Sequence, residues 1–249
     1  MDVLKILIIL ILFVPSYANA TALSWKQVSP GLEYTVIFPF PNDINKKIHA
    51  FRIDLNHYKF SLLLAKNQHQ KAIFVTQAAM NADILIALNG GFFTPNFEPL
   101  GLRISAGKVF SPLKNINWWG IFIVEGKVAE ILSRQSFRYS PRMDVALQAG
   151  PRLIINGTIP KLKDGLAQRS AVGITQNGKV ILVVTQNLSL STVTLATMMK
   201  NPETQGGLAC YNALNLDGGS SSQLYAHIGS FHLDIPSIRP VAELLVVTH

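Results

Sequence analysis

Alternating hydrophobic and polar positions predict that this chain is built mainly of β-strands. In residues 48–55, Phe51, Ile53 and Leu55 fall on one face of an extended backbone, as in a half-buried strand. The same alternation, or a short apolar run bounded by turn residues, recurs along the chain. The predicted strands span residues 34–38, 48–55, 60–65, 84–88, 119–124, 127–132, 145–149, 153–155, 171–175, 180–185, 213–216, 222–226 and 243–247.

Helical signals are few. Residues 73–81 contain the helix formers Gln, Ala and Met, and residues 192–200 carry Leu195, Met198 and Met199 at helical spacing before Asn201-Pro202 ends the pattern. No Gly/Ser-rich or Pro-rich linker divides the chain. We therefore predict an α+β fold, a strand-rich single domain over residues 21–249 with a mixed β-sheet and few helices.

The first 20 residues have the features of a secretory signal peptide. Lys5 precedes an apolar run over residues 6–14, Pro15 interrupts it, and Ala18-Asn19-Ala20 resembles a small-x-small cleavage site. This run is shorter than the about 20 helical residues needed to cross a bilayer, and later apolar runs are interrupted. We expect a mature protein without an integral membrane segment that is periplasmic or secreted.

Composition narrows the classes of partner. The chain has 249 residues, with 22 Lys+Arg against 14 Asp+Glu and a net charge of +8, and its 49% hydrophobic content excludes a disordered chain. The basic charge favours an anionic partner such as a phosphate or an anionic glycan, although a high pI also occurs in exported proteins without a charged ligand. Scattered Lys and Arg argue against nucleic acid. Because Cys210 is the single cysteine, an internal disulfide is excluded.

Two tripeptides stand out because each follows an apolar strand that ends in Leu. They are Asn89-Gly90-Gly91 and Asp217-Gly218-Gly219, and Ser220, Ser221 and Ser222 extend the second. A buried strand holds its terminal Asn or Asp rigidly, while residues without Cβ let a ligand approach the backbone N–H groups. The alternative is a pair of tight turns in which Asn and Asp satisfy their own backbone.

Arg169 is the third candidate. It stands directly before the hydrophobic strand predicted at 171–175, where its planar guanidinium fork suits a phosphate or a carboxylate. The alternative is an ordinary surface arginine.

These segments together resemble the phosphodiester glycosidase family. The resemblance rests on ordered motifs: Asn89-Gly90-Gly91-Phe92-Phe93, Gly150-Pro151-Arg152-Leu153 with Asn156-Gly157, Arg169-Ser170-Ala171-Val172-Gly173, Asn215-Leu216-Asp217-Gly218-Gly219-Ser220, and Arg239-Pro240-Val241. It implies hydrolysis of an N-acetylglucosamine-like sugar-1-phosphodiester at the glycosidic side, in a family with bacterial members linked to exopolysaccharide.

The resemblance also implies a set of site residues. Asp217, Arg169 and Asn89 are the implied catalytic residues, and Gly90, Gly91, Gly218, Gly219 and Ser220 are the implied substrate- and phosphate-binding residues. Many relatives have a third glycine where this chain has Ser220, so a hydroxymethyl group either narrows the pocket or adds a donor. The resemblance therefore says less about which substrate this chain uses than about which reaction it carries out.

Several chemical questions stay open at the level of sequence. Ordinary glycosidases use two carboxylates, and Glu98, Asp144 and Asp234 are the candidates for a partner to Asp217. Asp217 and Asn89 are alternatively possible ligands of Ca²⁺ or Mg²⁺. His-x-x-x-His spacing is absent, which argues against a zinc hydrolase. A serine hydrolase is a minor alternative, with His227 as a partner of the serine run.

A second hypothesis is a non-catalytic exported protein that binds an anionic or phosphorylated glycan. It would use the same glycine turns and Arg169, with Phe92, Phe93, Trp118 and Trp119 as sugar-stacking platforms, although a buried Trp pair is the alternative role. Turnover separates an enzyme from a binding protein. Both hypotheses require that Asn89, Arg169 and Asp217 converge in space.

Overall fold

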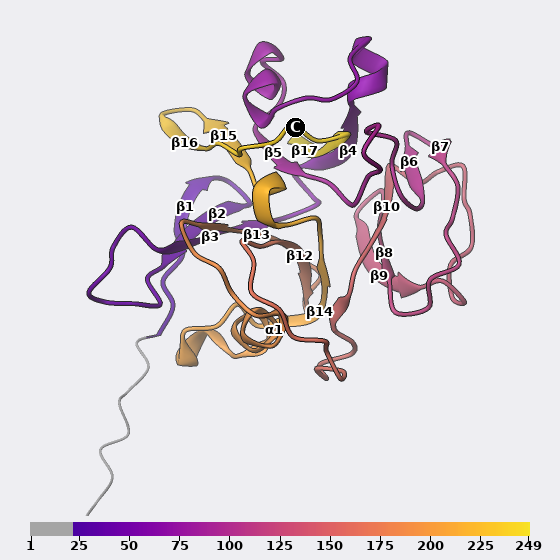
Figure 1. Cartoon of the computed structure of the whole chain (residues 1–249). Coiled ribbons are helices and arrows are strands. Elements are labelled where there is room, and N and C mark those ends of the chain that lie inside the picture. Colours follow the sequence, from indigo (N-terminus) through magenta and orange to yellow (C-terminus); the bar gives the residue numbers. More distant parts are fainter. Residues whose placement is uncertain (1–21) are drawn as a thin grey trace, which may run out of the picture.

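A computed structural model describes residues 22–249, which form 17 strands in three sheets, one α-helix and short 3₁₀ turns (Figure 1). The predicted signal peptide, residues 1–20, lies outside the described residues. Over residues 22–249, no helix is long and apolar enough to cross a membrane.

The largest sheet has seven strands in the order β1-β2-β3-β13-β12-β14-β11. Its central strands are continuous apolar segments because both faces of the sheet are covered. The strands are β1 (Lys26–Ser29), β2 (Leu32–Ile37), β3 (Lys47–Ile53), β11 (Arg152–Ile154), β12 (Ser170–Thr175), β13 (Val180–Gln186) and β14 (Cys210–Asn215).

Two five-stranded sheets pack around it, one at the top and one at the right of Figure 1. The first has the order β16-β15-β5-β17-β4 and comprises β4 (Lys59–Leu64), β5 (Ile86–Asn89), β15 (Leu224–Ile228), β16 (Phe231–Ile235) and β17 (Glu243–Thr248). The second has the order β7-β6-β10-β8-β9 and comprises β6 (Arg103–Ser105), β7 (Lys108–Ser111), β8 (Gly120–Glu125), β9 (Val128–Ser133) and β10 (Val145–Ala149).

The three sheets share one hydrophobic core. Phe51 of β3, Leu88 of β5 and Phe122 of β8 are all fully buried in it. A second cluster lies between the large sheet and α1 (Thr192–Lys200), which buries Leu195 and Met199 against Ile181 and Ala213. The four 3₁₀ turns are η1 (Ala65–Gln68), η2 (Val75–Met80), η3 (Glu203–Gln205) and η4 (Gly219–Ser221).

The strand-rich single domain and the scarcity of helices are as predicted, but the mixed sheet is not. Every strand pair in the described residues is antiparallel. With a single nine-residue α-helix, the label α+β fits only loosely. The helical signal over 73–81 produces only the 3₁₀ turn η2, in which Val75 and Ala78 are buried.

Candidate active site

The two Asx-Gly-Gly turns lie in contact although they end strands of different sheets. Asn89 is the last residue of β5, and Asp217 follows β14. The backbone N–H of Asp217 donates to the carbonyl oxygen of Gly90 at 3.1 Å, and Asn89 Nδ2 donates to the carbonyl oxygen of Asp217 at 2.7 Å. The fold thus joins residues that are far apart in sequence at one junction between sheets.

Asn89 holds this junction from inside the protein. Its side chain is fully buried, and Oδ1 accepts from Ser170 Oγ at 2.6 Å and from the N–H of Gln223 at 3.2 Å. With Nδ2 bound to Asp217, the amide has protein partners at both ends. Asn89 therefore positions the Asp217 turn and does not present a free group to a ligand.

Arg169 and Asp217 line one cleft of about 820 Å³. Phe92 and Trp118 contribute aromatic walls, and Trp118 is 61% exposed whereas Trp119 behind it is buried. The rest of the wall comes from the turn before β11, the segment between β11 and β12, the start of α1 and the junction itself. These further lining residues are Gly150, Pro151, Lys161, Leu162, Lys163, Asp164, Gly165, Leu166, Ala167, Thr192, Asn215, Gly218 and Gly219.

Arg169 directly precedes β12, an inner strand of the large sheet, and is largely buried. Its Nε donates to the carbonyl oxygen of Leu190 at 2.8 Å, Nη2 donates to the carbonyl oxygen of Gly165, and its backbone N–H donates to Thr185 Oγ1. Burial lowers the pKa of the guanidinium, and the nearby Asp164 charge opposes that shift. No ion pair within residues 22–249 neutralises Arg169. Two of its five side-chain N–H donors have protein acceptors among the described residues, and the other three have none there.

Asp217 is the carboxylate that faces the cleft from the junction. Burial raises its pKa above the ordinary value of 3.8, while hydrogen bonds from Ser221 and the N–H of Gly218 and the charges of Arg239 and Arg103 oppose the shift. Oδ1 accepts from Gly218 N–H at 2.9 Å. A partly desolvated carboxylate held in this way is a candidate nucleophile or base.

The glycines of both turns matter chiefly for their size. Gly91 N–H donates to Glu243 Oε1 at 3.0 Å and Gly219 N–H to the carbonyl oxygen of Gln168 at 2.8 Å, so both donors already have protein acceptors. A Cβ at Gly90 would lie 2.6 Å from Glu243 Oε1, and one at Gly218 would lie 2.6 Å from the carbonyl oxygen of Gln168. Direct phosphate binding by these amides stays a prediction.

A carboxylate that the sequence patterns did not single out lies beneath this junction. Glu243, the first residue of β17, and Arg103 of β6 form an ion pair with an Nε–Oε1 distance of 2.6 Å, and both side chains are fully buried. Arg103 also donates to the carbonyl oxygens of Phe92, Leu102 and Gln148. Burial raises the pKa of Glu243, the Arg103 guanidinium opposes the shift, and the Asp217 charge adds to it.

The position of Glu243 in the sequence carries a usable signal. It begins an apolar strand, much as Arg169 stands directly before one.

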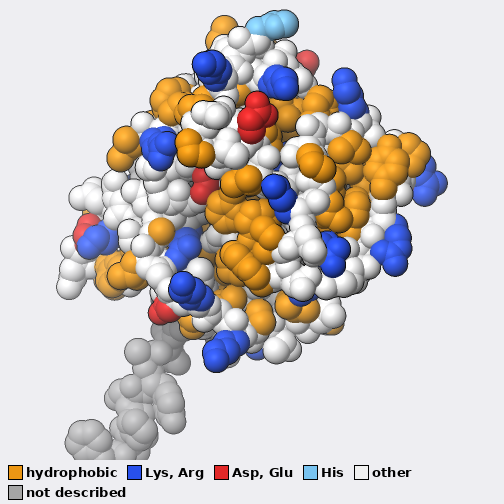
Figure 2. Space-filling view, turned by 45° about the vertical axis from the view of Figure 1, so that its right-hand side comes forward, with side chains coloured by type: hydrophobic (Ala, Val, Ile, Leu, Met, Phe, Trp, Pro, Cys, Tyr) orange, Lys and Arg blue, Asp and Glu red, His pale blue; other side chains and the backbone are white. Residues whose placement is uncertain are grey.

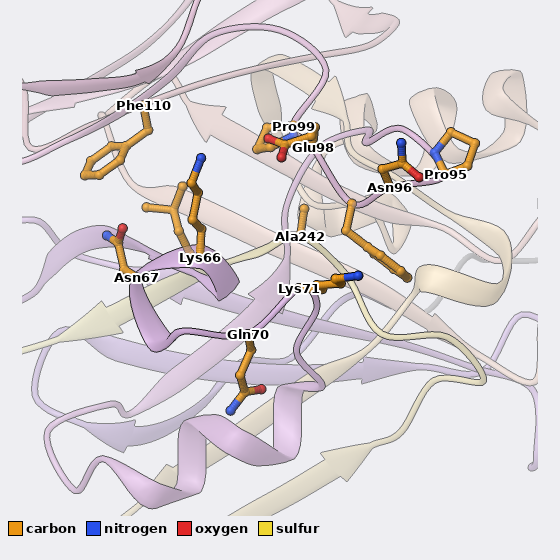
Figure 3. Close-up of a pocket in the computed structure, with 12 residues that line it drawn as sticks. Lys66, Asn67, Gln70, Lys71, Pro95, Asn96, Glu98, Pro99, Phe110 and Ala242 are labelled. Atoms are coloured by element: carbon orange, nitrogen blue, oxygen red, sulfur yellow. The ribbon is translucent and has the colours of Figure 1, made fainter.

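The three carboxylates considered as partners of Asp217 lie elsewhere. Asp144 Oδ2 accepts from the N–H of Gly126, and Asp234 is exposed on β16. Glu98 lines a separate hollow of about 510 Å³, where it faces Lys66 and Lys71 (Figure 3). None of the three lines the cleft of Arg169 and Asp217.

The residues at the junction do not fit the suggested Ca²⁺ or Mg²⁺ site. Asn89 Oδ1 already accepts two hydrogen bonds, so it is not available as a ligand. Within the described part of the chain, no group of three His, Cys, Asp or Glu residues could hold a metal ion. His227 lies on β15 against His232 of β16, which gives no support to a serine hydrolase pair.

Comparison with known proteins places these residues in a family. Residues 82–248 match the phosphodiester glycosidase family. The chain is 32% identical over 115 residues to the Escherichia coli (strain K12) protein named uncharacterized protein YigE, a match that covers 41% of this chain and 45% of YigE. The match thus spans less than half the length of that curated relative.

Solved structures share the fold. The catalytic domain of zebrafish N-acetylglucosamine-1-phosphodiester alpha-N-acetylglucosaminidase, auto-inhibited by its pro-peptide, superposes with a TM-score of 0.68 at 21% identity over 92% of this chain and 87% of that one. A hypothetical protein from Synechocystis superposes with a TM-score of 0.60 at 16% identity over 92% of this chain and 64% of that one. The family match covers more than half of the chain and includes Asn89, Arg169, Asp217 and Glu243. The chain belongs to the phosphodiester glycosidase family.

Proposed function

We propose that this protein is an exported hydrolase that cleaves a sugar-1-phosphodiester, with an N-acetylglucosamine-like sugar, at its glycosidic side. The observation that carries the proposal is that Arg169, with free donors, and Asp217, with a raised pKa, line the same cleft. The family of the chain and its basic charge support an anionic substrate, and Figure 2 shows Lys and Arg side chains around apolar patches on one face.

The proposed reaction breaks the bond between the anomeric carbon and the phosphate oxygen. The bonding electrons leave with the phosphate, water supplies the oxygen that ends on the anomeric carbon, and the products are a free sugar and a phosphomonoester. Phosphate is a good leaving group, so Arg169 donors can stabilise its developing charge without a strong general acid. Asp217 would act at the anomeric carbon as nucleophile or as base for water.

Glu243 would support this chemistry without touching the substrate. Its Oε1 fixes the N–H of Gly91 and the guanidinium of Arg103, and Arg103 in turn holds the carbonyl oxygen of Phe92 in the cleft wall. We assign Glu243 and Arg103 as positioning residues for the Asp217 side of the cleft.

The test is turnover by the purified protein. The substrate is N-acetylglucosamine-1-phosphate esterified to the 6-hydroxyl of methyl mannoside, and the protein should release N-acetylglucosamine from it. Asp217→Asn and Arg169→Ala should each reduce kcat/KM by at least about 100-fold, because each removes a group that stabilises the transition state. The matched controls Asp83→Asn and Arg142→Ala change exposed residues outside the cleft and should retain activity. Binding without any turnover would instead support the glycan-binding protein.

Export belongs to the same proposal. The leader-like residues 1–20 support a periplasmic or secreted protein. Expression of the full chain in a Gram-negative host should give a product in the periplasm or medium whose mass corresponds to a start at Thr21, and a cytoplasmic product of full mass would refute export.

A further inference from the structure

The hollow of about 510 Å³ that contains Glu98 is separate from the cleft. Its lining comes from the segment after β4, from the loop between β5 and β6, and from Phe110 of β7 and Ala242 beside β17. It shares no lining residue with the cleft of Arg169 and Asp217. A role for this space, called the Glu98 hollow below, is therefore additional to the proposed hydrolysis.

Two lysines without an ion-pair partner stand at one side of the Glu98 hollow. Lys66 belongs to η1 and Lys71 follows that turn, and both side chains are exposed. Within residues 22–249, neither lysine forms an ion pair. Lys108 adds a third cation beside the wall, with Nζ 5.3 Å from the centroid of the Phe110 ring. This concentration of positive charge favours an anionic ligand.

Glu98 faces the two lysines from the loop on the other side (Figure 3). It forms no ion pair in the described part of the chain, so it does not neutralise Lys66 or Lys71 through a direct contact. A carboxylate accepts hydrogen bonds from hydroxyl groups, whereas an ammonium group only donates. A ligand that satisfies all three side chains must therefore supply both an anionic group and hydroxyl donors.

The loop that carries Glu98 is held in one shape by its own contacts. The N–H of Phe97 donates to the carbonyl oxygen of Thr94 at 2.8 Å, and the N–H of Thr94 donates to the carbonyl oxygen of Glu98 at 2.9 Å. The rings of Phe93 and Phe97 are stacked with their centroids 5.4 Å apart. Phe97 has a φ of 62°, a conformation that is uncommon for a bulky residue. This wall of the hollow is therefore preformed.

Apolar side chains form the floor and part of the walls. Leu64 and Ala242 are buried, and Phe97, Pro99 and Phe110 are half-buried. Apolar surface with a few polar groups is the usual lining of a small-molecule site. The C–H face of a sugar ring packs on such a surface, and an inorganic anion gains nothing from it.

Side-chain amides complete the rim of the hollow. They belong to Asn67, Gln70 and Asn96. Gln70 Oε1 accepts from Gln77 Nε2 at 2.7 Å, so a protein contact orients this amide and its NH₂ group remains a donor. Amides both donate and accept, and they match the hydroxyl groups of a saccharide.

We propose that the Glu98 hollow is a second, non-catalytic site that binds an acidic saccharide. The carboxylate or phosphate of the sugar pairs with Lys66 and Lys71, and its hydroxyl groups bond to Glu98 and the amides. Lysine acts as a point charge toward either anion, so the two anions share one binding chemistry. The site attaches the protein to an anionic glycan, whether or not the cleft turns over a substrate.

Calorimetric titration tests this site with trigalacturonate and glucose 6-phosphate, each against its neutral counterpart, maltotriose or glucose. At least one acidic ligand should bind about tenfold more tightly than its counterpart, and the ligand that does so identifies the anion. The double variant Lys66→Gln/Lys71→Gln should weaken that binding about tenfold, the size expected for two exposed ion pairs. The matched double variant Lys127→Gln/Lys200→Gln removes the same charge at exposed positions outside the hollow and should bind normally.

Arg169→Ala and Asp217→Asn separate this inference from the proposed function, because both change the cleft and leave the hollow intact. Both variants should keep the affinity for the acidic saccharide even when turnover is lost. Loss of affinity in Arg169→Ala but not in the Lys66/Lys71 variant would place the ligand in the cleft and overturn the site. Equal affinity for acidic and neutral ligands, or for inorganic phosphate and glucose 6-phosphate, would also overturn it. Binding to phosphatidylglycerol vesicles without affinity for either acidic ligand would assign the lysines to a membrane surface instead.

Discussion

Two carboxylates serve the junction between the sheets in different ways. Glu243 is fully buried, and its Oε1 is shared between Arg103 and the N–H of Gly91. Asp217 is only half-buried, accepts from the N–H of Gly218 and faces the cleft. When two titratable groups have such different environments, their roles divide accordingly. Asp217, the half-buried member, carries the proposed chemistry, and the buried Glu243 fixes the backbone around it.

The raised pKa of Asp217 predicts that ionisation of its carboxyl group destabilises the folded protein. A carboxyl whose folded pKa exceeds its ordinary value of 3.8 contributes stability below pH 3.8 and loses that contribution as the pH rises through the folded pKa. We expect Asp217→Asn to abolish activity yet to raise stability at pH 7 by about 1 kcal/mol, or about 2–4 °C in Tm. Calorimetry should show the gain shrinking as the pH falls toward 3.8, and a gain independent of pH would contradict this cause.

The Arg103–Glu243 pair predicts strong coupling between two substitutions. Glu243→Gln and Arg103→Met should each cost about 3–5 kcal/mol, because each leaves an uncompensated buried group. The double variant should cost far less than the sum, since no buried charge then lacks a partner. Urea unfolding of the four proteins measures the coupling. Additive losses would show that the two side chains act independently.

The sequence predicts correctly those strands whose buried residues form a simple pattern along the chain. Strands such as β10 and β13 read as apolar runs because both faces are covered. The pattern misses β6 because Arg103 interrupts it, and the burial of an arginine there is explained chiefly by its ion pair with Glu243, 140 positions away. It also misses β16, whose alternate residues are exposed at a sheet edge.

The turn after β5 provides a prediction about close packing. A Cβ at Gly91 would lie 2.5 Å from Arg103 Nη2 and 3.0 Å from the carbonyl oxygen of Gln148. Gly91→Ala should therefore destabilise the protein by about 1–3 kcal/mol, the usual cost of overpacking. Gly165→Ala is the matched control because a Cβ there meets nothing within 4 Å. Thermal unfolding compares the two, and equal stability would show that the turn relaxes without cost.

At the scale of the molecule, the candidate site depends on contacts between sheets. The sequence alone identifies Asn89, Arg169 and Asp217 as strand-end residues, and the resemblance to a family orders them. Neither the sequence nor the resemblance distinguishes buried Asn89, whose amide is satisfied by Ser170 and Asp217, from Arg169, which keeps free donors. That difference arises from long-range hydrogen bonds, which local periodicity does not encode.

The net charge of +8 leads to a prediction about ionic strength. Lys161, Lys163 and Arg169 in the cleft wall add a local positive field to this overall charge. Salt shortens the Debye length from about 30 Å at 0.01 M to about 8 Å at 0.15 M. Across this range, kcat/KM for an anionic sugar-1-phosphodiester should fall several-fold, mainly through KM. The uncharged analogue p-nitrophenyl N-acetylglucosaminide should show no such fall if it is hydrolysed. Equal salt dependence for both substrates would mean that salt acts on the protein and not on its attraction for the phosphate.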